Sequence, residues 1–191
     1  VEPRWRTPLL AGLVIATIAS GSLEYARWQP RAVTIDAIRA AAKHIEIGAR
    51  VMTAVVREQV KDSALPNAVD LTALDRKTFV PSFFTTRGQS TIVVNDAYRK
   101  IAAENAVEGT YPTVAEITPL LGQQPPVLSD KGPRGLRPYR DMACEFDYLY
   151  IIGDLPRGAS LPPSLRLLEA KDGFSLYRIV APPERHCPPR R

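Results

Sequence analysis

The sequence predicts an α/β protein, with one N-terminal transmembrane helix followed by a small mixed-sheet α/β sandwich that ends in an antiparallel hairpin. Three observations lead to this prediction. The chain opens with an uncharged apolar run, helix-like and strand-like patterns alternate after it, and two strand-like segments flank a short turn near the C-terminus. We therefore expect a transmembrane helix over 8–27, an α/β domain over 32–181, whose extracytoplasmic location is argued from the features below, and a basic, proline-rich tail over 182–191.

The N-terminal run carries no charge between Arg6 and Glu24, and as a helix it would span about 25 Å, slightly less than a hydrocarbon core of about 30 Å. A transmembrane helix is the preferred interpretation, because Trp5 precedes the run and Trp28 follows it, where interfacial aromatic residues belong. A buried core helix is one alternative. A secretory signal peptide is the other, supported by the basic start and the small residues at 19–21.

The first part of the expected domain combines a helix, a strand and a second helix. Thr34 can cap a helix whose apolar residues recur at spacings of three and four, and Gly48 supplies its left-handed C-terminal residue. The segment 49–56 is short and rich in β-branched residues, which predicts a buried strand. A short helix is expected around 66–75.

Proline and turn residues shape the middle of the chain. A strand over 78–85 contains Pro81, which cannot donate to a sheet, so we expect this strand at an edge or at a bulge. A second short strand and a helix over 96–105 are expected next. The capping box that begins at Thr113 then opens another short helix, and 123–145 has the composition of a long loop.

The clearest strand signal lies over 146–154, where an almost continuous apolar run predicts a central position in the sheet. The segments 164–170 and 174–181 flank Lys171-Asp172-Gly173, and this arrangement predicts a closing hairpin. We expect its last strand to run antiparallel beside the central strand.

The composition excludes several classes of function. The chain has 191 residues and a net charge of +5, but the basic excess lies near the N-terminus, in 131–140 and in the last residues. No stripe of Lys and Arg alternates with stacking aromatic residues, so we expect no nucleic-acid binding. The sequence holds neither an Asp-x-Asp metal motif nor a glycine spacing suited to phosphate binding, so no cofactor and no metal site are expected.

Two candidate binding features remain. Asp154 follows the central strand, and open α/β sheets bind ligands beyond the carboxyl ends of their strands; the alternative is that Asp154 forms a turn with Gly153. A basic loop offers cationic groups that suit the phosphate oxygens of anionic lipid headgroups or of a polyprenyl phosphate, and its alternative is a solvated loop. The basic residues of this loop are Lys131, Arg134, Arg137 and Arg140.

The two cysteines, Cys144 and Cys187, bear on the compartment. If the last strand runs antiparallel to the central one, its end lies beside the start of that strand, and the following tail covers about 20 Å, enough for the sulfurs to meet. An oxidising periplasm would then hold a disulfide, whereas in the cytosol the pair would stay reduced. A zinc site that uses His186 is the rival, but it falls short of the four ligands of a structural site.

Several of these segments carry a resemblance to a known family. In order they are the apolar run, GARVMTAVV at 48–56, FVPSFFTTRGQS at 79–90, FDYLYIIGDLP at 146–156 and LYRIV at 176–180. Their succession resembles the C-terminal extracytoplasmic region of bacterial multi-pass membrane proteins related to polyprenyl-phosphate-sugar-dependent (C-type) glycosyltransferases. The resemblance covers most of the chain from Leu9 to Val180.

This resemblance implies a protein of the bacterial inner membrane with its soluble domain on the periplasmic side. It implies the lipid bilayer and a polyprenyl-phosphate-linked sugar or glycan acceptor as partners. The catalytic acid of such proteins lies in an early extracytoplasmic loop outside this chain, so no catalytic residue is assigned here. The expected function is that of an accessory domain of a membrane glycosyltransferase-like protein. The alternative is a single-pass membrane-anchored binding or scaffold domain without enzymatic activity.

Overall fold

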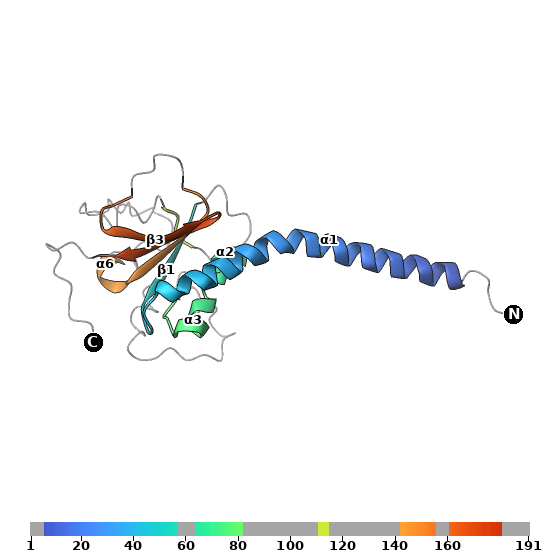
Figure 1. The fold of residues 1–191 in the computed structure, drawn as a ribbon, viewed down its shortest axis with the longest axis horizontal. Coiled ribbons are helices and arrows are strands. Elements are labelled where there is room, and N and C mark those ends of the chain that lie inside the picture. Colours follow the sequence, from blue (N-terminus) through green and yellow to red (C-terminus); the bar gives the residue numbers. More distant parts are fainter. Residues whose placement is uncertain (1–5, 57–63, 82–110, 115–141, 156–160, 181–191) are drawn as a thin grey trace, which may run out of the picture.

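The computed structural model describes residues 6–56, 64–81, 111–114, 142–155 and 161–180. It shows one long helix that projects from a small α/β domain (Figure 1). The elements are α1 (Arg6–Ala41), the 3-10 helix η1 (Ala42–His44), β1 (Val51–Val55), α2 (Ala64–Ala68), α3 (Leu71–Arg76), α6 (Met142–Glu145), β2 (Tyr148–Ile152), β3 (Leu165–Lys171) and β4 (Phe174–Ile179). The expected α/β class, with a mixed sheet and one N-terminal helix able to cross a membrane, is confirmed.

Helix α1 contains 36 residues and is therefore about 54 Å long. It runs without a break through the segment where the sequence predicted the end of one helix and the start of another. The expected cap at Thr34 is wrong, because Thr34 lies inside α1 and its hydroxyl donates to the carbonyl of Pro30 at 3.3 Å. An internal proline removes one backbone hydrogen bond and bends a helix without necessarily ending it, and Figure 1 shows α1 changing direction along its length.

The sheet is mixed and has the strand order β1-β2-β4-β3. Strands β1 and β2 pair in parallel, whereas β4 pairs antiparallel with both β2 and β3. Strand β2 therefore has a neighbour on each side, and all of its residues are buried, so the predicted central position is confirmed. Strand β3 lies at one edge and carries a register shift between Leu167 and Glu169.

Several expected local elements differ from those observed. The helix expected over 66–75 is two short helices, α2 and α3. Lys77, the residue directly after α3, has a left-handed backbone conformation (φ 54°). Where a strand was expected from residue 78 onward, the described part makes a single bridge between Phe79 and Arg50. The segment expected to be a loop ends in a helical turn, α6. Gly48 has the expected positive φ, at 79°. The expected helix over 96–105 lies outside the described residues.

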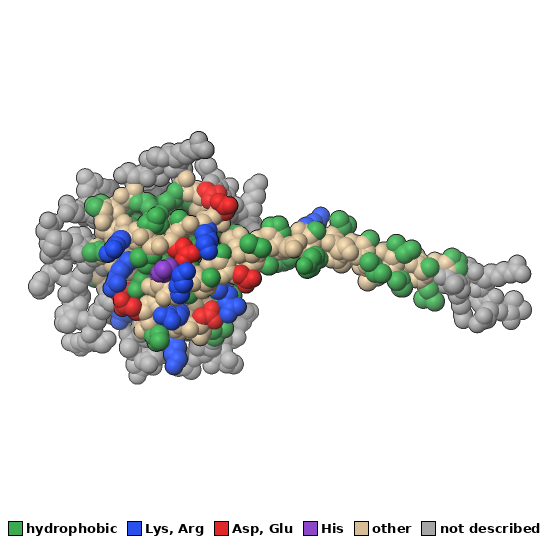
Figure 2. Space-filling view, viewed as in Figure 1, with side chains coloured by type: hydrophobic (Ala, Val, Ile, Leu, Met, Phe, Trp, Pro, Cys, Tyr) green, Lys and Arg blue, Asp and Glu red, His purple; other side chains and the backbone are tan. Residues whose placement is uncertain are grey.

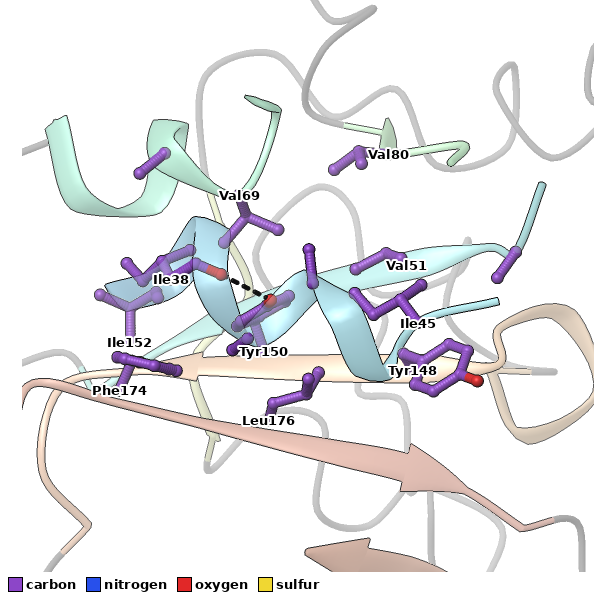
Figure 3. Close-up of a cluster of buried hydrophobic side chains, with 14 residues drawn as sticks. Ile38, Ile45, Val51, Val69, Val80, Tyr148, Tyr150, Ile152, Phe174 and Leu176 are labelled. Atoms are coloured by element: carbon purple, nitrogen blue, oxygen red, sulfur yellow. Dashed lines mark hydrogen bonds between the residues drawn. The ribbon is translucent and has the colours of Figure 1, made fainter. Parts of the chain in front are cut away.

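Side chains on both faces of the sheet are buried. On one face, the second half of α1 lies across the sheet and supplies Ile38 and Ala41 to a cluster that also contains Ile45, just after η1, with Tyr150 and Phe174 (Figure 3). The cluster on the other face consists of Met52, Ala54, Phe79, Phe146, Leu149, Ile151, Tyr177 and Ile179. Helix α1 is therefore both a projecting rod and a part of the core.

Candidate membrane anchor and its attachment to the domain

The projecting half of α1 exposes large apolar side chains on all sides. Within the described part of the chain, α1 is the helix that is long and apolar enough to cross a membrane, and none of its apolar stretch is buried. Figure 2 shows hydrophobic side chains along this half, whereas charged side chains gather on the domain. The exposed large apolar residues of α1 are Leu9, Leu10, Leu13, Val14, Ile15, Ile18, Leu23, Tyr25, Trp28 and Val33. This exposure contradicts the buried-core-helix alternative, and the transmembrane helix and the signal peptide remain.

Several polar side chains in the projecting half of α1 have interaction partners within the same helix. The Thr17 hydroxyl donates to the carbonyl of Leu13 at 2.9 Å, as expected for a hydroxyl in an apolar helix. At the domain side of the apolar run, Arg27 and Glu24 form an ion pair at 3.1 Å. The Arg31 guanidinium lies 5.0 Å from the centre of the Trp28 ring, within the range of a cation–π contact. Charges and a tryptophan thus meet where a membrane interface would lie.

Two tyrosines of β2 attach the second half of α1, and the residues that follow η1, to the sheet. The Tyr150 hydroxyl donates to the carbonyl of Ile38 at 3.0 Å, and the amide of Glu46, just after η1, donates to the Tyr148 hydroxyl at 3.4 Å. Burial raises the pKa of Tyr150 well above its ordinary value of 10, with a smaller contribution from the charge of Glu169. The Tyr150 phenol therefore stays protonated and keeps its hydrogen bond at any physiological pH.

Helix α3 forms a second attachment. Arg39 of α1 donates through two nitrogens to the two carboxylate oxygens of Asp75, each at 2.9 Å. The hydrogen bond from Arg39 lowers the pKa of Asp75 below its usual value. Arg76 donates twice to the carbonyl of Ile45, at 2.9 and 2.7 Å, which satisfies a backbone acceptor just after η1.

A charged cluster joins η1 to the edge strand β3. The carboxylate of Glu169, whose side chain is 13% exposed, lies 3.0 Å from Lys171 Nζ, 3.1 Å from His44 Nε2 and 3.8 Å from Lys43 Nζ. The hydrogen bond from Lys171 is the main cause that lowers the pKa of Glu169. The sequence did not predict this cluster, because Lys43 and His44 lie far along the chain from Glu169 and Lys171.

The comparisons with known proteins give no match: no family model, no curated protein and no solved structure matches this chain. The resemblance noted from the sequence therefore stays an expectation. What the chain can do is inferred from its own geometry.

The two aspartates that flank β2 bond to backbone amides at opposite ends of the sheet. Asp154 Oδ1 accepts from the amide of Gly173 at 3.1 Å, so its carboxylate braces the turn between β3 and β4, a contact that the sequence did not predict. Asp147 Oδ2 accepts from the amide of Arg50 at 2.9 Å, beside the start of β1. A ligand-binding role of Asp154 stays a prediction.

The remaining predicted site residues are placed only in part. The basic loop of Lys131, Arg134, Arg137 and Arg140 lies outside the described residues, as does Cys187. Cys144 is 7% exposed and is disulfide-bonded. Its pairing with Cys187 stays a prediction. Among the described residues, no group of three or more His, Cys, Asp and Glu side chains is placed to hold a metal ion.

Proposed function

We propose that this chain is a membrane-anchored domain, in which the projecting half of α1 spans the bilayer and the other half holds the α/β domain close to the membrane surface. One observation carries the proposal: a single helix is exposed over 8–30, where its uncharged apolar run extends to Leu23, yet it supplies the fully buried Ile38 and Ala41 to the domain core. Transfer of a large apolar side chain out of water is worth about 1.5–3 kcal/mol. The seven large aliphatic side chains between Leu9 and Leu23 are 55–68% exposed, so together they favour lipid by on the order of 10 kcal/mol.

The proposed location of the domain is extracytoplasmic, on the periplasmic side of a bacterial inner membrane. The disulfide at Cys144 supports this location, because disulfides persist in oxidising compartments and are rare in the cytosol. The sequence resemblance supports it independently. The charges beside the apolar run do not decide the orientation, because Arg4 and Arg6 lie on one side and Arg27 and Arg31 lie on the other.

The proposed role is that of an accessory domain of a membrane glycosyltransferase-like protein, supported by the sequence resemblance. Its partners would be the bilayer and a polyprenyl-phosphate-linked sugar or glycan acceptor. The second candidate is a single-pass anchored binding or scaffold domain, and the continuous helix α1 serves that role equally well. The gene upstream of Val1 distinguishes the two roles: further hydrophobic segments, with an acidic residue in the loop after the first, favour the glycosyltransferase-like parent.

Alkaline carbonate extraction of membranes tests the anchor. We expect the full chain to stay in the membrane pellet. A double substitution, Leu13→Arg with Ile18→Arg, places two charges in the apolar run and costs about 5–7 kcal/mol of insertion free energy, so it should release the protein. The matched control is Ile47→Arg with Leu74→Arg, at domain positions that are 71% and 70% exposed, and it should stay in the pellet. Release of the unmodified chain would contradict the anchor.

Reporter fusions test the side of the membrane. Alkaline phosphatase folds only in an oxidising compartment, so a C-terminal fusion should be active, and a fusion to green fluorescent protein exported in the same way should be dark. A thiol count on the denatured, unreduced protein should find no free thiol. A fluorescent fusion to green fluorescent protein, together with two free thiols in the unreduced protein, would place the domain in the cytosol.

The basic loop has its own test. If Lys131, Arg134, Arg137 and Arg140 contact anionic lipid, changing all four to Gln should reduce co-sedimentation of a fragment that lacks the apolar run with anionic vesicles at low salt. Unchanged co-sedimentation would leave the loop as a solvated segment. This readout is independent of the anchor, because the fragment starts at Arg31.

A further inference from the structure

The docked part of α1 runs antiparallel to β2. The carbonyl of Ile38 accepts a hydrogen bond from the Tyr150 hydroxyl. Farther along the chain, the amide of Glu46 donates a hydrogen bond to the Tyr148 hydroxyl. As the chain advances from 38 to 46, its contacts on β2 therefore move backward along the strand. The C-terminal end of β2 thus lies beside the earlier part of α1, which is the part nearest the apolar run.

The same end of the sheet carries the turn between β3 and β4. A Cβ added at Gly173 would lie 3.5 Å from Thr34 Cγ2, so this turn is in contact range of α1. Gly153, just after β2, donates its amide to the carbonyl of Gly173 at 2.8 Å. Because β1 is parallel to β2, its C-terminal end, at Val55, lies at this end too. Figure 1 shows the turn on the side of the domain from which α1 projects.

Little chain separates this end of the sheet from the transmembrane segment expected over 8–27. Thr34 follows Trp28 by six helical residues, which span about 9 Å. A headgroup layer is roughly 5–8 Å thick, from a total thickness of about 40–45 Å and a core of about 30 Å. The connection is a continuous helix that contains Pro30, and it holds the domain in a more fixed orientation than a flexible linker would.

We propose that the C-terminal ends of β1 and β2 and the turn at Asp172-Gly173 rest against the lipid headgroups of the bilayer that holds α1. This inference rests on the proposed anchor. The exposed side chains described at this end are of both signs, Lys171 with Asp154 and Asp172, so geometry rather than attraction to anionic lipid sets the contact. The contact therefore persists in neutral lipid and at high salt.

The opposite end of the sheet faces away from the membrane. Strand β2 and the two residues that follow it span about 20 Å between Tyr148 and Asp154, at about 3.3 Å per residue. Ile47, which is 71% exposed, follows Glu46 and marks this distal end. Open α/β sheets bind ligands beyond the carboxyl ends of their strands, so a ligand of this domain would meet it at the membrane surface.

Tryptophan quenching by a nitroxide on the headgroup of phosphatidylcholine tests the orientation in the full chain. With Trp5→Phe, the remaining Trp28 reports the anchor. With both native tryptophans changed to Phe, Asp172→Trp reports the proximal turn and Ile47→Trp is the matched distal control. Lys171→Trp, at a side chain that is 51% exposed, is a second proximal probe in case the turn does not tolerate Trp.

The expected result is a loss of emission at Asp172→Trp or Lys171→Trp comparable to that at Trp28, unchanged by added salt, with no loss at Ile47→Trp. If Trp28 is quenched but neither proximal probe is quenched more than Ile47→Trp, the inference is overturned while the anchor stands. If Trp28 itself is not quenched, the anchor fails, and the inference fails with it.

Discussion

Truncation of Ile38 tests whether the helix that enters the membrane is also part of the domain core. Ile38 is 0% exposed and lies in the cluster between α1 and the sheet (Figure 3). Ile38→Ala removes three carbons, worth about 2.4 kcal/mol at about 0.8 kcal/mol each. The cavity that is left adds to this loss, so we expect a decrease in the free energy of unfolding of about 3 kcal/mol.

Ile47→Ala is the matched control, because it makes the same chemical change at a side chain that is 71% exposed. Its effect should stay within about 0.5 kcal/mol. Both variants are compared by urea unfolding of the full chain in mild detergent. Near-UV circular dichroism is the signal of choice, since Tyr148, Tyr150 and Tyr177 are buried in the domain while the apolar half of α1 stays helical in detergent.

Equal unfolding midpoints for the two variants would refute the reasoning. That result would mean that the domain folds without α1, and that the helix is only a tether. A loss of several kcal/mol at Ile38→Ala alone would show that the second half of α1 is part of the folded core of the domain. For a domain of typical stability, about 5–15 kcal/mol, such a loss is a large fraction of the total.

Three further substitutions test individual contacts by urea unfolding. Tyr150→Phe deletes the hydrogen bond to Ile38 and should lower the free energy of unfolding by about 1 kcal/mol. Thr53→Val should raise it by about 1 kcal/mol, because the buried Thr53 hydroxyl has no hydrogen-bond partner among the described residues. Glu169→Gln should flatten the pH dependence of stability. The folded-state pKa of Glu169 is lowered from 4.5, so its stabilising contribution is present above about pH 4.5 and is lost as the pH falls through the folded-state pKa.

Each of these expectations has a contrary outcome. An unchanged midpoint for Tyr150→Phe would mean that water replaces the lost bond. A destabilised Thr53→Val would show that its hydroxyl has a partner in the protein in solution. Parallel stability curves for Glu169→Gln and the unmodified chain between pH 3 and pH 6 would show that its cationic neighbours do not hold the carboxylate, and Glu46→Gln, on an exposed pair, serves as the control.

The sequence by itself determined the local features of this protein. The uncharged run before Glu24 specified a helix able to cross a membrane, because length and apolarity are properties of one segment. The continuous apolar run over 146–154 specified a strand buried on both faces, and β2 is that strand. Gly48 specified a backbone with positive φ, since only glycine adopts it without steric cost.

The tertiary structure decided how these parts are joined. The sequence suggested a helix boundary near Thr34, because a capping residue favours one there, yet α1 continues through Pro30 and Thr34 into the core. Burial of Ile38 and its neighbours against the sheet compensates for the backbone hydrogen bond that Pro30 removes. Such compensation depends on residues more than a hundred positions away, and local pattern carries no information about them.

The roles of charged side chains were decided in the same way. From the sequence, Asp154 was either a ligand-binding residue or part of a turn with Gly153. In the folded chain its carboxylate accepts a hydrogen bond from the amide of Gly173, in the turn between β3 and β4. Glu169 carried no signal at all, because Lys43 and His44 of η1 reach it only in the folded domain. Hydrogen bonds and ion pairs act over a few ångströms in space whatever the distance along the chain, so only the packed fold determines which groups meet.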